Sequence, residues 1–419
     1  MNAVFIFLIF SSFIFAALRQ WTWVAASAAD TSSPMNALTL AIIESSKSAV
    51  TLALGLVGVM AFFLGLMKIA EKGGLLLIIA KLLRPLMVRL FPDVPSDHPA
   101  MGAMIMNIAA NVLGLGNAAT PFGIKAMQQL NTLNEDKTTA SNAMVLFLAI
   151  NTSSVTLLPT GVIALRASAG STDPAGILPS TLFATLISTT VAILAAKFFQ
   201  KFYAQESPTK SSTMAPDSSA GETPWMSYLS VGAVIGFIPL AILWGDVMAP
   251  WMIPVLVLGI VGFGWRKNVP IYETFVEGAK DGFDVALKII PYLVAIMAAV
   301  AMFRDSGALD FIIGPLAFLT EPLGLPTDAL PMALLRPLSG SGAYGVLAST
   351  IENPAIGPDS YVGYLVSTLQ GSTETTFYVL AVYFGAVGIR RLRHGLITAL
   401  SADLAGIVAA VVICKMLFT

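Results

Sequence analysis

Long apolar runs decide what this chain can fold into. A helix needs about 20 apolar residues to cross a bilayer. Runs near this length recur at 3–18, 49–67, 177–199, 229–244, 249–263, 284–303 and 395–418. Charged residues make up only 11% of the chain, whereas a soluble domain has about 25%, and the mean hydropathy is +0.80. We therefore predict an all-α polytopic membrane protein.

Charge and residue counts exclude several classes of function. The formal net charge of −1 offers no basic face for nucleic acid. One cysteine, Cys414, and two histidines, His98 and His394, exclude a disulfide framework and a Cys/His metal site. No nucleophile and base stand out as a pair, so we expect no enzyme, no cofactor and no bound metal. GLGNAA and GSGAYG look like nucleotide fingerprints, but no predicted strand precedes either of them.

The first apolar run has two interpretations. We expect a retained membrane helix, because a basic n-region is lacking and because Arg19, Trp21 and Trp23 are typical interfacial anchors. The alternative is a cleaved signal sequence, since the small-residue stretch ASA follows the run.

A Ser/Pro/Thr-rich segment divides the chain into two related halves. Residues 205–223, QESPTKSSTMAPDSSAGET, have the composition of a flexible linker. They separate a first half, 1–204, from a second half, 224–419. In each half a Glu-x-x-Lys pair precedes an apolar run, and a Gly-rich and then a Ser/Thr-rich interruption follow. We therefore predict two copies of one repeat, at about 44–200 and 277–418.

Basic residues predict that the two repeats are inverted. Residues 68–100 contain five Lys or Arg, whereas the equivalent 303–331 contains only Arg304. Later in the repeat the bias reverses, because Arg166 stands alone and the second half has a cluster. The cluster consists of Arg390, Arg391, Arg393 and His394. Since basic residues remain cytoplasmic, the halves should have opposite orientations, with about nine crossings, two re-entrant segments, a cytoplasmic N-terminus and an external C-terminus.

Polar interruptions predict broken helices. Glycine costs about 1 kcal/mol and proline about 3 kcal/mol relative to alanine inside a helix, so breaks are expected at NIAANVLGLGNAATPFG and at RPLSGSGAYG. A second pair of interruptions is INTSSVTLL and QGSTETTFY. The span 360–389 would be about 45 Å long as one helix, which exceeds the hydrocarbon thickness of about 30 Å. We expect two half-helices joined by an unwound middle near the midplane.

These interruptions predict a site for a polar solute or ion. Irregular backbone at membrane depth must face protein or a watery cavity, and half-helix ends attract charge. Glu374 is the leading candidate, because ionisable groups within a membrane are costly. The alternative is structural: hydroxyls that bond to their own backbone, an acid in a salt bridge, and Arg336 as an interfacial anchor. The candidates are Asn107, Asn111, Asn117, Thr120, Asn151, Thr152, Ser153, Ser154, Arg336, Ser339, Ser341, Gln370, Ser372, Thr373, Glu374, Thr375 and Asp403.

At these motifs the chain resembles a known family. NIAANVLGLGNAATPFGIKAMQQLN with GLMKIAEKGGL resembles spore maturation protein A, and LRPLSGSGAYG with GSTETTFYVLAVYFGAVGIRRLRHGLITALSADLAGIVAA resembles spore maturation protein B. The chain thus resembles a natural fusion of the two. Both belong to the nucleoside-recognition, or Gate, domain group, which is similar to parts of concentrative nucleoside transporters. The resemblance implies paired inverted repeats whose broken helices meet at a midplane site.

Two functions remain open. We expect a secondary transporter or permease of a small polar solute, whether nucleoside-like, organic or ionic, in the bacterial inner membrane, with H⁺ or Na⁺ coupling through Glu374. The alternative is a non-transporting component of envelope, peptidoglycan or spore maturation machinery. The expected partners are the bilayer, the solute, and a second copy of the chain or an envelope protein, but no nucleic acid. If the breaks converge, Glu374, Ser153 and Gly340 should surround one cavity.

Overall fold

The computed structural model describes residues 2–23, 33–113, 116–154, 156, 158–203, 251 and 253–418. Within these ranges the chain is helical, with one isolated bridge between Thr139 and Arg391. Three described helical segments are long and apolar enough to cross a membrane: Phe5–Thr22, Leu178–Phe202 and Gly395–Leu417. The prediction of an all-α membrane protein is confirmed, whereas the predicted linker at 205–223 and the apolar run at 229–244 lie outside the described residues.

The same succession of helices occurs in both halves. The first half contains α1 (Asn2–Thr22), α2 (Pro34–Lys72), α3 (Leu75–Leu90), α4 (Pro99–Val112), α5 (Gly116–Thr132), α6 (Asn142–Ser153), α7 (Thr160–Ser168), α8 (Leu178–Phe199) and η1 (Gln200–Phe202). After a helix at Ile253–Arg266, the second contains α10 (Ile271–Asp305), α11 (Ala308–Thr320), η2 (Glu321–Leu323), η3 (Thr327–Ala329), α12 (Leu330–Leu335), α13 (Gly340–Ile351), α14 (Tyr361–Ser372), α15 (Thr376–Gly385) and α16 (Gly395–Leu417). Helices α2 to α8 thus correspond in order to α10 to α16.

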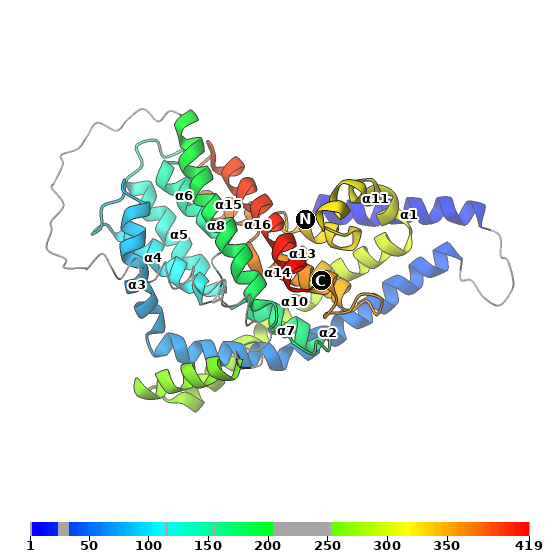
Figure 1. Ribbon diagram of the computed structural model, residues 1–419, viewed down its shortest axis with the longest axis horizontal. Coiled ribbons are helices and arrows are strands. Elements are labelled where there is room, and N and C mark those ends of the chain that lie inside the picture. The colour runs from blue at the N-terminus through cyan, green and yellow to red at the C-terminus, as the bar shows by residue number, and fades with distance from the viewer. Residues whose placement is uncertain are drawn as a thin grey trace.

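Equivalent helices of the two halves pack antiparallel. Helices α2 and α10 lie side by side (Figure 1), with Lys72 at the end of α2 paired with Glu277 near the start of α10. Helices α8 and α16 also pack together, and Tyr203, just after α8, contacts His394, just before α16. Antiparallel packing of equivalent helices is the arrangement that an inverted repeat produces.

The Gly-rich interruption of each half, NIAANVLGLGNAATPFG or RPLSGSGAYG, lies within a helical hairpin. Helices α4 and α5 pack against each other, and the side chain of Asn107 on α4 donates to the carbonyl of Ala119 on α5. The shorter α12 and α13 form the second hairpin, which turns at 336–339. Gly340 begins α13, and Ser339 caps this helix by accepting from the amide of Gly342. The glycine-rich and serine-rich motifs therefore mark the tips of hairpins.

Two helices, α3 and α11, were not predicted from the sequence pattern. The first, Leu75–Leu90, lies within the basic stretch 68–100, and the second, Ala308–Thr320, lies within the equivalent stretch 303–331. Both carry exposed apolar side chains, among them Leu82 on α3 and Phe318 on α11. Both also contain an internal proline, Pro85 or Pro315. Proline is unfavourable inside a helix, and α3 also has charged residues among its apolar ones. Neither segment therefore has the uninterrupted apolar pattern that predicts a membrane helix.

An ion-pair network joins the halves where α7 ends. We call it the Arg166 clamp; it consists of Arg166, Ser171, Thr172, Asp359 and Tyr364. The guanidinium of Arg166 is fully buried, pairs with Asp359 at 3.0 Å and lies 4.2 Å from the ring centroid of Tyr364. Asp359 also accepts from the hydroxyl of Ser171 and from the amide and hydroxyl of Thr172. The clamp fixes the loop after α7 to the loop before α14.

A second clamp, made mainly by the backbone, joins the equivalent loops with the halves exchanged. The amides of Arg390 and Arg391 donate to the carbonyl of Thr138, and Ala140 donates to the carbonyl of Arg391. The guanidinium of Arg393 donates to the carbonyl of Ala140 and to the side chain of Asn142. The loop after α15 is thus fixed to the loop before α6, as the inverted repeat requires.

Candidate functional site

Two unwound segments cross between the clamps. The described residues between α6 and α7 are 154, 156, 158 and 159, and residues 373–375 separate α14 from α15. The backbone amide of Glu374 donates to the carbonyl of Thr152 at 2.8 Å. The break between α14 and α15 therefore touches, through the main chain, the last turn of α6, about 220 residues away in sequence. This is the meeting of broken helices that the sequence predicted.

Two cavities adjoin at this crossing. The larger has a volume of ≈ 500 Å³ and the smaller a volume of ≈ 240 Å³. Asn111, Gly340 and Glu374 line both. Of the predicted residues, the larger cavity also has Thr120, Asn151, Ser339, Ser341 and Thr375 on its wall, and the smaller also has Arg336, Gln370 and Thr373.

Arg336, at the tip of the α12–α13 hairpin, is hydrogen-bonded to the break between α14 and α15. It is 5% exposed, and its guanidinium donates to the hydroxyl of Thr375 at 3.1 Å and to the carbonyl of Thr373. Its Nη2 also lies 3.8 Å from Oε2 of Glu374, whose side chain is 47% exposed. Arg336 is thus not an interfacial anchor. It satisfies unwound backbone and offsets part of the charge of Glu374.

Tyr383 connects the asparagines of the first half to α15. Its hydroxyl lies 3.2 Å from Nδ2 of Asn107 and 3.2 Å from Oδ1 of Asn151, which also accepts from Asn111 at 3.0 Å. This tyrosine was not predicted as a site residue, because it stands in an apolar run. A buried tyrosine hydroxyl nevertheless requires a polar partner, and the asparagine-rich first half could supply one.

Two further tyrosines were also missed. Tyr378 lines the larger cavity, and Tyr344 lines the smaller one. The hydroxyl of Tyr344 donates to the carbonyl of Gly161, close to the start of α7. Tyrosine side chains from the second half therefore line both cavities, in addition to the predicted Asn, Ser and Thr residues.

Several predicted residues lie off the cavity walls. Asn107 is buried behind Tyr383, and Asp403 is buried beside Thr376. Ser154 pairs with Thr156, while Ser372 is buried. Asn117 lies in the first turn of α5, but its side chain is outside the described structure.

The hydroxyl groups of Thr152 and Ser153 are hydrogen-bonded to the backbone of their own helix, α6. The hydroxyl of Thr152 donates to the carbonyl of Ala149, and that of Ser153 donates to the carbonyl of Ile150 and meets Thr189. The expectation that Ser153 would join Glu374 and Gly340 around one cavity is therefore wrong. Bonding to the preceding turn is usual for serine and threonine in membrane helices.

Two helix N-termini begin at the larger cavity. Helix α13 begins at Gly340, and α15 begins one residue after Thr375, and both of these residues line the cavity. Free amides at helix N-termini carry partial positive charge and attract oxygen-rich or anionic groups. Among the described residues no three His, Cys, Asp or Glu side chains are grouped to hold a metal ion. The cavity is therefore equipped for hydrogen bonding, with Glu374 as its acid.

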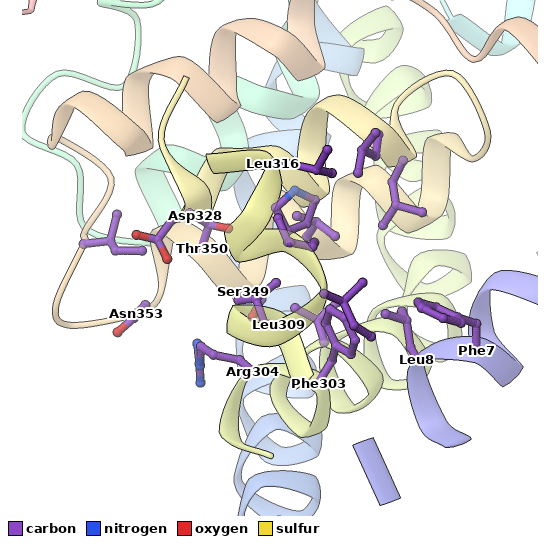
Figure 2. A pocket seen from close by; sticks show the side chains of 18 of the residues that line it. Phe7, Leu8, Phe303, Arg304, Leu309, Leu316, Asp328, Ser349, Thr350 and Asn353 are labelled. Carbon is purple, nitrogen blue, oxygen red and sulfur yellow. The ribbon is translucent and has the colours of Figure 1, made fainter. Parts of the chain in front are cut away.

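A third cavity, of ≈ 230 Å³, is mainly apolar. Figure 2 shows Phe7 and Leu8 from α1 on one side and Arg304, Asp328 and Asn353 toward the other. Except for Leu338, its lining is separate from that of the larger cavity. Its apolar walls do not suit a polar solute.

Comparisons with known proteins agree with these motifs. The Gate family, described as nucleoside recognition, matches residues 53–169 and 286–390. Spore maturation protein B of Bacillus subtilis (strain 168) is 49% identical over 167 residues, which cover 40% of this chain and 93% of that protein. Spore maturation protein A of the same organism is 50% identical over 159 residues, which cover 38% of this chain and 81% of that protein.

A solved structure of a CNTnw variant in an outward-facing state aligns over 99% of both chains, with 12% identity and a TM-score of 0.45. The two spore maturation proteins each match about 40% of the chain, as expected for a fusion. Since the family match spans more than half of the sequence, this chain belongs to the Gate, or nucleoside-recognition, family.

Proposed function

We propose that the protein is a membrane transporter that binds a small polar solute in the two adjoining cavities. The observation that carries this proposal is the crossing of two broken helices beside polar cavities of ≈ 500 Å³ and ≈ 240 Å³. Inverted repeats with broken helices at a central site are the usual construction of secondary transporters. The larger volume lies in the range of about 300–1,000 Å³ that is typical of small-molecule sites.

The residues of the cavity walls support a chemical class for the solute. Asn111 and Asn151 offer amides, Ser341 and Tyr383 offer hydroxyls, and Glu374 offers an acceptor. A neutral solute with several donors and acceptors, such as a nucleoside, matches this set better than an apolar one. The family description, nucleoside recognition, supports the same class.

Glu374 is the residue that we place at the centre of binding, because among the three residues that line both cavities it is the one with an ionisable side chain. Glu374→Gln keeps the shape of the side chain but removes its charge, so solute hydrogen bonds to a carboxylate would weaken. Loss of a charged hydrogen bond costs about 1.5–3 kcal/mol, or roughly a 10- to 150-fold loss of affinity.

The experiment uses uridine and adenosine as probes. Purified protein should show an increase in melting temperature with one of them, and proteoliposomes should take up the same radiolabelled probe. Glu374→Gln should reduce both, while Glu135→Gln, an exposed acid in the loop before α6, should reduce neither. Equal loss in both variants, or none in either, would contradict the role of Glu374.

A second candidate is a non-transporting component of spore maturation or envelope machinery. The names of the two relatives, which are 49% and 50% identical to parts of this chain, favour it. This function requires no solute to enter the cavities. Failure of a broad panel of nucleosides, nucleobases and sugars to bind or cross the membrane, with folded protein, would favour this candidate.

Orientation and coupling belong to the same proposal. The charge distribution supports a cytoplasmic N-terminus and an external C-terminus. Coupling to H⁺ or Na⁺ through Glu374 would be detected as uptake that depends on the matching ion gradient. Binding of a homo-oligomeric or envelope partner is a further expectation, to be measured by the mass of the complex in detergent.

A further inference from the structure

Asp403 is a buried carboxyl group with one of its oxygens unused. It lies on α16 and is 4% exposed. Its Oδ2 accepts from the hydroxyl of Thr376 at 2.7 Å, whereas its Oδ1 has no hydrogen-bond partner among the described residues. A buried carboxylate is costly unless a proton or a cation neutralises it. The unused oxygen therefore requires an explanation.

No described cation pairs with Asp403. The charge of Arg336 reaches it, but that guanidinium is already bound to Thr373 and Thr375 and pairs with Glu374. Helices α6, α8, α14 and α15 pack against α16, and α6 has no titratable side chain. Four of the titratable side chains on the other three helices contact other groups: Lys197 donates to Leu90, Tyr361 donates to Gly324, Tyr364 lies against Arg166, and Tyr383 donates to Asn151. The fifth, Tyr378, lines the larger cavity. Within α16, Cys414 and Lys415 are about three turns away.

In the first half, the residues beside the break between α6 and α7 are hydrogen-bonded to neutral side chains of α8. Thr185 on α8 donates to the carbonyl of Ser153 at 3.0 Å, and Thr189 on α8 lies 2.9 Å from the hydroxyl of Ser153. In each half, therefore, the last helix of the repeat is hydrogen-bonded to residues beside the break. The bond in the first half has no titratable partner, whereas the bond in the second half depends on Asp403.

We propose that Asp403 is a proton-binding site that controls the start of α15. A hydronium ion from the aqueous side gives its proton to Oδ1, so one O–H bond of the hydronium ion breaks, one O–H bond forms at Oδ1, and a water molecule leaves. Neutralisation weakens the hydrogen bond from Thr376 to Oδ2, because bonds to charged acceptors are stronger than bonds to neutral ones. A metal cation would require several oxygen ligands, and Thr376 is the side chain that the structure shows bonded to this carboxyl.

Proton binding at this point would reach the larger cavity through the chain itself. Thr376 is the first residue of α15, and its neighbours Thr375 and Tyr378 line that cavity. Loosening Thr376 would let both side chains move. This consequence rests on the proposed transport function, whereas proton binding itself does not.

Infrared titration of the purified full-length protein in lipid nanodiscs tests the site. The wild type should show the C=O band of a protonated carboxyl that disappears as the pH is raised. Asp403→Asn should lose the component of that band that Asp403 contributes. Glu374→Gln should retain it, and so should Ser401→Ala, which changes a hydroxyl on the same helix that bonds to its own backbone. A band that titrates unchanged in Asp403→Asn would overturn the proposal.

Thr376→Val provides an independent readout if Asp403→Asn does not fold. It removes the donor without touching the acid, so the midpoint of the band should move; an unmoved midpoint overturns the proposal. Replacing KCl by NaCl should leave the band unchanged, and displacement by sodium would overturn a proton site in favour of a sodium site. The infrared titration is done without solute, so its result does not depend on transport. If the band of Asp403 titrates but no probe is taken up, transport is refuted and the proton site is not. If a probe is taken up but the band is missing, the proton site is refuted and transport is not.

Discussion

At the scale of single residues, chemical type predicted some of the site and hid the rest. Glu374 and Asn111 were expected at the site because polar groups in apolar runs are costly, and both line the two cavities. Tyr383 was missed because an aromatic residue in an apolar run has the pattern of a packing residue. Ser153 was wrongly placed, since sequence cannot tell a hydroxyl that faces a cavity from one bonded to its own helix.

Gly123 tests how closely Tyr383 must approach α5. A Cβ built on Gly123 would lie 2.1 Å from the hydroxyl oxygen of Tyr383. Gly123→Ala should therefore destabilise the protein by about 1–3 kcal/mol through overpacking. Gly102→Ala is the matched control on α4, where nothing lies within 4 Å of an added Cβ. Thermal unfolding in detergent measures both, and equal melting temperatures would refute the close contact.

At the scale of elements, breaks were easier to predict than contacts. Glycine, proline and runs of serine and threonine predicted where hairpins turn and helices unwind, because these residues are unfavourable inside a helix. Contacts between distant loops left no local pattern. Arg166 was interpreted as a marker of orientation, yet it is fully buried and bound to Asp359 of the other half. A side chain whose partner lies 193 residues away cannot be assigned from spacing.

The Arg166 clamp predicts a dependence of stability on pH. Burial acts to raise the pKa of Asp359, but hydrogen bonds from Ser171 and Thr172 and the charge of Arg166 outweigh it and hold this pKa below its ordinary value. The clamp should therefore contribute fully above the unfolded pKa of about 3.9 and lose its contribution as pH falls through the lower folded value.

Asp359→Asn measures the contribution of the clamp. It should cost about 1–3 kcal/mol, because Arg166 loses a charged partner. The difference in melting temperature from the wild type should be constant between pH 7 and pH 5 and shrink below about pH 4. Asp97→Asn, in an exposed loop before α4, is the control. A difference that grows with acidity would contradict the clamp.

At the scale of the whole molecule, charge predicted inversion but not packing. The distribution of lysine and arginine led to opposite orientations for the halves, and equivalent helices do pack antiparallel. The pairing of α2 with α10, however, depends on the shape of two apolar surfaces, as where Gly65 faces Phe275. Different apolar helix surfaces have similar sequences, so the sequence does not predict which helices pack together.

The orientation can be measured by cysteine labelling without first removing native cysteines, because Cys414 is the only one in the sequence and is fully buried. Ala355→Cys lies in the loop that the Arg166 clamp holds, and Glu135→Cys lies in the loop before α6. A membrane-impermeant maleimide added to whole cells should label Ala355→Cys and leave Glu135→Cys and the wild type unlabelled. Labelling of both variants from outside would refute the orientation.

The hydrogen bond from Glu374 to Thr152 has a consequence for stoichiometry. The carbonyl of Thr152 belongs to the last turn of α6 and the amide of Glu374 to the unwound segment of the other half, so one copy of the first half is needed for every copy of the second. Two separate polypeptides would have to be made in matched amounts and find each other in the membrane. A single chain contains both halves, so each round of translation produces them in a one-to-one ratio. This ratio is set before either half enters the bilayer.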